Sequence, residues 1–395
     1  MTLRKKTFVT IYPDFENVHV MKEPGQIGYM FSKLFGFDSE VVTYRNGEYA
    51  NLKYTPNLKL SFIKKRINFK FIDLNCIGYI VKNATRIDIL HMQHFKFDTL
   101  AAGFVYKILN PKGFFFVRLN FGPSDYFGSQ PDIRFWFKSD GRFRTKIKNF
   151  LQKKFASYVD LWSEEDIESS RFVTSKYSFF GDKLIEVHNG INLDLINEFN
   201  IRLKSFNEKD NIILYSAARI GSFQKATEVL LETYALLPED ISWELHIAGS
   251  MQEEFNDIIK VFFERNPKHK TKIFIHGELG KKDLFELYNR AKIFCLFSRF
   301  ESFPNVLPEA MYFKNTLIIT NFAGAKIVID NNKSGSIVER DNPQQIVKVL
   351  TKYLTDNKLL EKTGVHAHDF ALNNLGWDKI AKDLFEEMKA HGYQG

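Results

Sequence analysis

Residues 293–311 read IFCLFSRFESFPNVLPEAM, which predicts a short buried strand, a loop and the start of a helix. The first five residues are apolar and typical of a strand, whereas Pro304 disfavours a helical conformation at the residue before it. Asn305 is a favourable N-cap residue, so we expect a helix that begins at Val306 and has Pro308 in its first turn. The stretch therefore predicts one strand–loop–helix unit of an α/β sheet.

Such units recur along the chain, because short β-branched or aromatic runs alternate with segments of helical spacing. The expected strands are Thr7–Tyr12, Glu40–Tyr44, Lys70–Leu74, Asp88–Met92, Gly113–Leu119, Val159–Trp162, Leu184–His188, Asn211–Ala217, Trp243–Ala248, Lys272–His276, Ile293–Phe297, Thr316–Thr320 and Gly335–Val338. Helices are expected between them, as at Gln224–Leu237 and Lys281–Ala291. The pattern predicts the α/β class, with two doubly wound, Rossmann-like domains whose boundary falls near Asn189–Asp210. Ligands bind at the carboxyl ends of such strands, so we expect the active site in a cleft between the two domains.

The length of 395 residues fits two domains, and 44% apolar with 26% charged residues is an ordinary globular balance. The two cysteines, Cys76 and Cys295, lie in apolar runs, which excludes a disulfide scaffold and predicts buried thiols in a reducing compartment. No apolar stretch approaches the ~18 residues of a membrane span, and Thr7–Tyr12 predicts a strand where a signal peptide would have its apolar core. We therefore expect a cytoplasmic protein whose membrane contact is peripheral, on the inner face of the membrane.

The net charge of +8 lies entirely in the first half of the chain. Residues 1–200 carry 29 Lys and Arg against 21 Asp and Glu, whereas residues 201–395 carry 26 of each. Two stretches concentrate the cations: Arg134–Lys154 has eight with five Phe or Trp, and Lys53–Lys70 has six and no acid. Cations interleaved with aromatics indicate a surface for anionic lipid, in which Arg142, Arg144, Lys146 and Lys148 would act with Trp136 and Phe143. Nucleic-acid binding and a solvated helix over a core are the alternatives.

Two carboxylates follow the strand of the opening stretch. Glu301 lies in the loop and Glu309 at the fourth helical position, and a carboxylate can accept hydrogen bonds from two sugar hydroxyls. The N–H groups of Val306 and Leu307 are expected to be unpaired at the start of the helix, where they would attract an anion. The alternatives are a capping box, Ser298 with Glu301, and a solvated helix glutamate for Glu309.

Two cations lie in a second strand–loop–helix segment, residues 215–225. Arg219 ends the expected strand, and Lys225 begins the expected helix after a loop that contains a glycine. A planar guanidinium and a mobile ammonium at such a rim suit a diphosphate, although any surface loop can hold one Arg and one Lys.

These two groups of residues, in this order, resemble the pattern of glycosyltransferase family four, whose members are retaining enzymes with the GT-B fold. Glu301 and Glu309 match the family's motif of two glutamates separated by seven residues, and Arg219 and Lys225 match its phosphate-binding motif. Further similar segments are the glycine loop Lys22–Gly28, the domain-linking His188–Asn192 and the final helix Trp377–Ala390. The resemblance implies an acceptor-binding domain at residues 1–195, a nucleotide-sugar-binding domain at 196–375 and a C-terminal helix, 376–395, that packs back on the first domain.

The resemblance also implies a role for each matched residue. The catalytic residues would be Glu301, which would hold the donor sugar, and Arg219 and Lys225, which would bind the donor diphosphate. Glu309 would hold the ribose hydroxyls, and Gly25 would let the N-terminal loop approach the diphosphate. Backbone amides would meet sugar and phosphate at Phe303, Asn305 and Val306. Two cations and a helix N-terminus would balance the leaving group's charge, so neither a metal nor a cofactor is expected beside the nucleotide sugar.

The chain departs from the family pattern at several positions. In the second domain, the family often has Gly and Pro where this chain has Lys314 and Thr316, and an acidic residue where this chain has Ile327. Where the family often has a histidine in the first domain, this chain has Asn120, with His91 and His94 at the end of a neighbouring strand. Asn120 and His94 are expected to bind substrate, and the alternative for either histidine is a packed or surface residue.

The resulting hypothesis is a retaining, metal-independent transferase that moves a hexosyl unit from a UDP- or GDP-linked sugar to a glycan or lipid-linked glycan. Its expected setting is bacterial envelope polysaccharide synthesis, with an anionic membrane as peripheral partner and no nucleic acid. The alternatives are a non-catalytic binding protein that keeps this fold and, less favoured, a nucleic-acid-binding protein built on the basic half.

Overall fold

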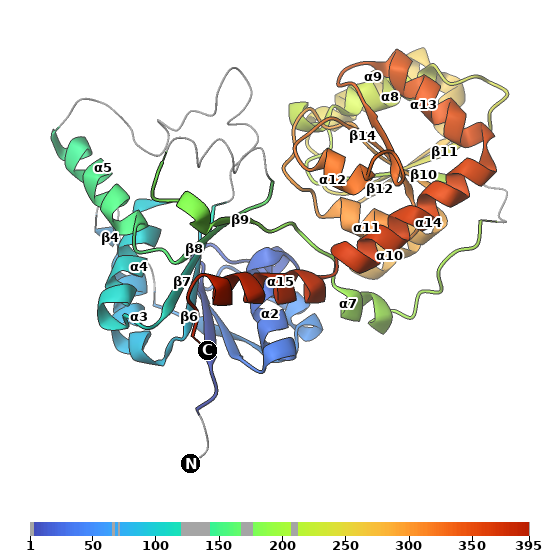
Figure 1. The fold of residues 1–395 in the computed structure, drawn as a ribbon. Coiled ribbons are helices and arrows are strands. Elements are labelled where there is room, and N and C mark those ends of the chain that lie inside the picture. Colours follow the sequence, from blue (N-terminus) through green and yellow to red (C-terminus); the bar gives the residue numbers. More distant parts are fainter. Residues whose placement is uncertain are drawn as a thin grey trace. The chain divides into compact units, whose positions relative to one another are not determined.

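The structure is a computed structural model, and it describes residues 4–64, 68–69, 72–119, 143–166, 177–206 and 212–394. The chain forms two compact units (Figure 1). The first unit comprises Met1–Asn192 together with Trp377–Gly395, and the second comprises Leu193–Gly376. The domain ends expected from the sequence, residues 195 and 375, differ from these limits by three residues and one.

The first unit is built on a parallel sheet that has seven strands in the described residues, in the order β3-β2-β1-β6-β7-β8-β9. Its strands are β1 (Thr7–Ile11), β2 (Asp38–Thr43), β3 (Leu58–Phe62), β6 (Ile89–Gln93), β7 (Phe114–Arg118), β8 (Leu161–Glu164) and β9 (Leu184–Glu186). Its helices are α1 (Asn17–Val20), α2 (Glu23–Phe35), α3 (Leu74–Asn83), α4 (Phe97–Leu109), α5 (Phe143–Ala156) and α15 (Trp377–Ala390), with short 3-10 turns at Ala50–Tyr54, Ala84–Arg86 and Gly181–Lys183.

Both faces of this sheet are buried, because successive strand residues enter two different apolar clusters. Phe8 and Phe114 pack with α2 and α15 on one face, whereas Val9 and Phe115 pack with α3 and α4 on the other. A parallel sheet covered on both faces is the doubly wound arrangement that the sequence predicts.

One expected strand of the first unit is wrong. The prediction placed it at Lys70–Leu74, but among the described residues β5 (Ile72–Asp73) pairs with β4 (Asn68–Phe69) and not with the large sheet, and α3 begins directly after it. The carboxylate of Asp73 accepts hydrogen bonds from the N–H groups of Asn75 and Cys76, which fixes the helix start there. The edge strand is instead β3, whose polar and basic residues concealed it in the sequence.

The C-terminal helix α15 belongs to the first unit, as predicted. It lies along α2 (Figure 1), where the rings of Phe385 and Phe35 stack with centroids 4.2 Å apart. The N–H group of Trp377 donates to the carbonyl of Ile191, 3.1 Å away, so the returning chain is joined to the segment that leaves the unit.

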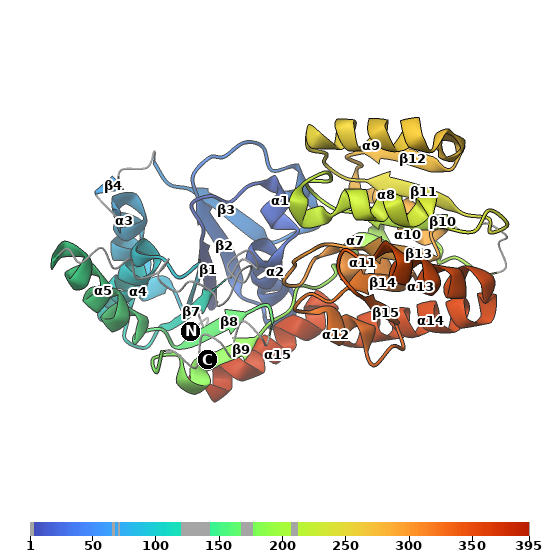
Figure 2. The same cartoon turned by 90° about the horizontal axis from the view of Figure 1, so that it is seen from above.

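The second unit has a six-stranded parallel sheet in the described residues, and Figure 2 shows its order, β12-β11-β10-β13-β14-β15. The strands lie where the sequence predicts them: β10 (Ile212–Ser216), β11 (Glu244–Ala248), β12 (Ile273–Gly277), β13 (Ile293–Leu296), β14 (Thr316–Thr320) and β15 (Gly335–Val338). The helices are α7 (Leu193–Glu198), α8 (Thr227–Ala235), α9 (Glu254–Arg265), α10 (Lys281–Arg290), α11 (Val306–Tyr312), α12 (Ala325–Ile329), α13 (Pro343–Thr355) and α14 (Asn357–Asn374), with 3-10 turns at Phe223–Lys225 and Pro267–Thr271.

The structure also bears on the two cysteines and on membrane-spanning helices. Cys76 and Cys295 are both buried, as expected. Within the ranges that the structure describes, no helix combines the length and the apolar character needed to cross a bilayer.

Candidate functional site

The loops that follow β10 and β13 meet at the carboxyl ends of these neighbouring strands. The ammonium group of Lys225, in the first loop, forms an ion pair with the carboxylate of Glu301, in the second. The two side chains are only 8% and 10% exposed. Removing two charges from water costs free energy, so a buried ion pair is uncommon where the fold alone does not need it. Its place at the carboxyl ends of two neighbouring strands is typical of a functional site.

Arg219 lies at the rim of the same site. Its backbone is left-handed, with φ of 59°, and its N–H group donates to Oγ of Ser250 over 3.1 Å. Its guanidinium donates to Oε1 of Gln224 over 2.6 Å and is otherwise exposed. Lys225 does not begin the helix as expected: it ends the 3-10 turn Phe223–Lys225, and α8 starts at Thr227 after a left-handed Ala226.

The conformation around Glu301 decides between the two interpretations of that residue. No helix runs through residues 297–304, so the capping box with Ser298 is excluded. Asn305 occupies the N-cap position of α11 and Pro308 is its third residue, as predicted. The side chain of Asn305 makes no capping hydrogen bond, however, because its backbone is already helical.

The prediction of two unpaired N–H groups at the start of α11 is wrong for one of them. Leu307 donates to the carbonyl of Pro304, 3.1 Å away, because the chain folds back under the first turn. The N–H group of Val306 has no partner among the described residues. Three buried side-chain atoms nearby also lack a described partner: Oγ of Ser222, Oγ of Ser298 and Oδ1 of Asn305. Buried polar atoms without partners indicate a place for water or a ligand.

Glu309 is not a solvated helix residue, so that alternative is also excluded. Its carboxylate is buried and forms an ion pair with Lys281, the first residue of α10. Lys281 was not identified from the sequence. A lysine in the first turn of a helix is unfavourable beside the positive end of the helix dipole, so its position could have indicated an acidic partner. Each motif glutamate is therefore paired with a lysine in this structure.

Phe303 contributes its ring to the core of the second unit. The ring is 1% exposed and lies against Gly324, where an added Cβ would approach its Cδ2 to 2.6 Å. The N–H group of Gly324 also donates to the carbonyl of Ser302 over 3.0 Å. Packing thus fixes the loop of Glu301 against the β14–α12 turn.

The three second-domain residues that depart from the family pattern, Lys314, Thr316 and Ile327, contribute to the fold of the second unit. Lys314 adopts a left-handed conformation, with φ of 57°, which explains a preference for glycine there. Thr316 donates from its hydroxyl to the carbonyl of Leu360, and Ile327 lies within α12. None of the three forms a described hydrogen bond or ion pair with Arg219 or with the Lys225–Glu301 pair.

In the first unit, the expected glycine loop is a helix. Gly25 is the third residue of α2, and a Cβ there would lie 2.4 Å from the carbonyl oxygen of Val20. Close packing of α2 on the end of α1 therefore requires glycine at this position. An approach of Gly25 to a diphosphate stays a prediction.

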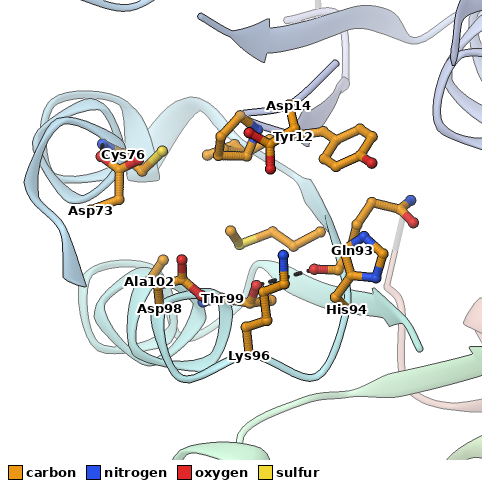
Figure 3. Close-up of a pocket in the computed structure, with 13 residues that line it drawn as sticks. Tyr12, Asp14, Asp73, Cys76, Gln93, His94, Lys96, Asp98, Thr99 and Ala102 are labelled. Carbon is orange, nitrogen blue, oxygen red and sulfur yellow. Dashed lines mark hydrogen bonds between the residues drawn. The ribbon is translucent and has the colours of Figure 1, made fainter. Parts of the chain in front are cut away.

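His94 lines a small cavity at the carboxyl ends of β1 and β6 (Figure 3). The cavity measures about 30 Å³ and is lined by Tyr12, Asp14, Lys96, Asp98 and Thr99, among others. Burial, with a smaller contribution from Lys96, lowers the pKa of His94 to about 4, so its imidazole is neutral near pH 7. The volume suits one or two water-sized groups, so it could take only one small polar group of a sugar.

His91 is a packed residue, in line with the alternative stated for it. It is fully buried, stacks on Phe116 and lies 3.2 Å from the carboxylate of Glu23. The buried guanidinium of Arg118 lies 3.6 Å from the same carboxylate. Burial alone would raise the pKa of Glu23, but Arg118 and the contacts with His91 and Gln93 lower it.

Arg118 also donates to the carbonyl of Val187 and to Oδ1 of Asn189, which fixes the Asn-Gly segment within the first unit.

Asn120 lies outside the described residues, so its role stays a prediction. In the part of the chain that the structure describes, no three or more His, Cys, Asp or Glu side chains cluster as they would around a metal ion. Metal independence remains a prediction.

Comparison with known proteins gives the family of the second unit. Residues 197–369 match the family model described as glycosyl transferases group 1. An uncharacterised glycosyltransferase of Methanocaldococcus jannaschii is 26% identical over 219 residues, which are 53% of this chain and 54% of that protein. The capsular polysaccharide biosynthesis glycosyltransferase CapM of Staphylococcus aureus is 25% identical over 50% of this chain and 51% of its own length. The chain thus spans about half the length of these curated relatives.

Among solved structures, Anabaena HepE in complex with UDP and glucose superposes with a TM-score of 0.69 at 12% identity, over 98% of this chain and all of HepE. Two Rossmann-like units and a C-terminal helix that returns to the first define the GT-B fold. With the family match over residues 197–369, the second unit is a group 1 glycosyltransferase domain.

Proposed function

We propose that this chain is a retaining glycosyltransferase that moves a hexosyl unit from a UDP- or GDP-linked sugar to a glycan or lipid-linked glycan. The observation that carries the proposal is the buried Lys225–Glu301 pair beside the exposed guanidinium of Arg219. The family match supports it, because residues 197–369 include both motifs. HepE was solved with UDP and glucose, and CapM acts in capsule synthesis, which favours a UDP donor and an envelope polysaccharide product.

In the proposed reaction, the bond between the anomeric carbon and the diphosphate breaks while a bond to an acceptor hydroxyl oxygen forms. The hydroxyl proton is released together with the nucleoside diphosphate. Arg219 and Lys225 would stabilise the charge that develops on the diphosphate, and such fixed cations contribute most where water is excluded. Glu301 would accept hydrogen bonds from the donor sugar and Glu309 from the ribose. No metal ion or cofactor is needed in this scheme.

The acceptor would bind the first unit, with His94 and the adjoining cavity taking a small polar group of it. A neutral imidazole can accept a hydrogen bond from an acceptor hydroxyl or donate one, whereas an imidazolium can only donate. The lowered pKa of His94 keeps the neutral form available at the expected cytoplasmic pH.

The proposal is tested by a panel of nucleotide sugars and nucleotides in a thermal-shift assay. A ligand present at 100 times its dissociation constant should stabilise the protein by about 2.7 kcal/mol, so the true donor should raise the melting temperature most. Turnover is then measured with that donor, with and without EDTA and with and without a glycan acceptor.

The expected result is stabilisation by UDP or GDP and their sugars, with release of nucleoside diphosphate that persists in EDTA. Stabilisation without any turnover would favour the non-catalytic alternative. No stabilisation by any nucleotide sugar would overturn the proposed function.

We also propose that helix α5 holds the protein on an anionic membrane, as the basic stretch suggests. The exposed face of α5 combines three lysines, Lys146, Lys153 and Lys154, with Ile147 and Phe150, which are 44% and 67% exposed. Trp136 and Arg142 lie outside the described residues, as do the side chains of Phe143 and Arg144. Lys148 and Lys153 each lie over an aromatic ring, of Phe97 and Tyr177 respectively, but Lys148 is only half-exposed whereas Lys153 is exposed. Lys148 is therefore a weaker candidate than the sequence suggested.

Changing Lys146, Lys153 and Lys154 to serine together should release the protein from phosphatidylglycerol vesicles. Each lysine near an anionic surface contributes ~1 kcal/mol, so the affinity should fall by about 100-fold, and added salt should do the same to the wild type. Co-sedimentation measures this. The control changes three α15 lysines that lie near acidic partners, namely Lys379, Lys382 and Lys389. If the α5 and α15 variants sediment equally with the vesicles, α5 does not hold the protein on the membrane and is a solvated helix.

A further inference from the structure

Arg299 joins three segments of the second unit, although neither motif includes it. Its side chain is 12% exposed. Its Nη1 donates to the carbonyl of Phe223 over 2.7 Å, and its Nε donates to Oδ1 of Asp341 over 2.9 Å. Its Nη2 donates to the carboxylate of Glu228 on α8. Burial disfavours the charged form of Arg299, but the hydrogen bonds to Asp341 and Glu228 raise its pKa above the ordinary value.

These contacts fix the phosphate-binding loop, residues 219–225, against the loop that carries Glu301. The guanidinium carbon lies 4.2 Å from the centre of the exposed Phe223 ring, two residues before Lys225. The backbone adds two links, because the N–H group of Arg299 donates to the carbonyl of Gln224 and Nε2 of Gln224 donates to the carbonyl of Phe300. Lys225 and Glu301 can meet only while these two loops keep their register.

The arrangement needs the shape of arginine as well as its charge. Three different nitrogens of one planar group bind three partners in three segments, and lysine has a single nitrogen on a flexible stem. A lysine at position 299 would keep a positive charge near the site but could not hold all three partners.

We propose that Arg299 is a positioning residue that sets the phosphate-binding loop for the diphosphate of the donor. This inference rests on the proposed function, because it assigns the loop a diphosphate ligand. It predicts that disturbing Arg299 weakens binding of the diphosphate part of the ligand and leaves binding of the nucleoside part, at Glu309, largely unchanged.

The test compares UDP with UMP, or GDP with GMP if the wild type prefers guanosine nucleotides, by calorimetry in the Arg299→Lys and Arg299→Met variants of the full chain. The dissociation constant for UDP should rise about tenfold or more in both variants, while that for UMP should rise less than about threefold. Glu228→Gln and Asp341→Asn should each give a smaller change of the same kind. Glu232→Gln is the matched control, because Glu232 lies one turn further along α8, is exposed and has no described partner.

The outcomes separate this inference from the proposed function. If wild-type protein binds UDP no better than UMP and GDP no better than GMP, the proposed diphosphate site fails, and the inference fails with it. If wild type prefers UDP and the Arg299→Lys variant keeps that preference, the positioning role alone is overturned. A parallel loss of UDP and UMP binding with a lower melting temperature would mean that Arg299 only stabilises the fold, which also contradicts the inference.

Discussion

Sugar transfer is expected to fall by about 10²- to 10⁴-fold when Arg219 and Lys225 are both replaced by alanine. Each charge-assisted hydrogen bond to the diphosphate is worth about 1.5–3 kcal/mol, and tenfold in rate corresponds to about 1.4 kcal/mol. Arg219 is exposed, so Arg219→Ala alone should weaken UDP or GDP binding with little change in the free energy of unfolding. Calorimetry with the nucleoside diphosphate and steady-state turnover measure the two effects.

Lys225→Ala needs a control, because it leaves the carboxylate of Glu301 buried without its partner. Removing one member of a buried pair costs about 3–5 kcal/mol of stability, and this could lower activity through unfolding alone. The double variant Lys225→Met/Glu301→Gln removes both charges and should recover most of that stability. It should still fail to bind the diphosphate. Wild-type affinity for UDP and GDP in the Arg219→Ala/Lys225→Ala variant would refute the diphosphate role of both cations.

The strands of the second unit could be predicted from the sequence because each has β-branched, aromatic or other apolar residues between clear breaks. Cys295 and its neighbours in β13 are fully buried, so every residue of the strand is apolar. The edge strand β3 could not be predicted in this way, because half-exposed strands tolerate residues such as Lys59. The helix expected at Gln224 begins only at Thr227, since the preceding loop is held by tertiary contacts to Arg299 that no local pattern contains.

The candidate site was predictable to the extent that its residues follow strands. Parallel strands end at one edge of a sheet, so Lys225 and Glu301 meet although they are 76 positions apart. The partners of these residues were not predictable, because Lys281 and Arg299 reach the site through folding rather than through spacing. The local conformation of Gly25 was also missed, since a glycine required by packing against Val20 looks the same in sequence as a glycine of a loop.

Glu301→Gln and Glu309→Gln are expected to act on different parts of the ligand. Glu301→Gln should lower turnover of the nucleotide sugar by about 10²- to 10³-fold, because the amide no longer provides a charged acceptor for the sugar hydroxyls. The same variant should bind UDP at least as tightly as wild type, because Lys225 then has no carboxylate that competes with the diphosphate. Glu309→Gln should weaken UDP and UMP to a similar extent, because both ligands carry the ribose.

Glu301→Gln should keep or strengthen UDP binding whereas Glu309→Gln should weaken it, and this difference makes the pair of variants informative. Both glutamates are buried and paired with lysines, so a purely structural role would give two similar losses of stability and of binding. Lys281→Gln is the matched control for Glu309→Gln, since it breaks the same ion pair from the other side and should weaken nucleotide binding less. Calorimetry with UDP and UMP, together with turnover of the nucleotide sugar, gives the comparison. If Glu301→Gln weakens UDP as strongly as Glu309→Gln does, the division between a sugar-binding and a ribose-binding glutamate is refuted.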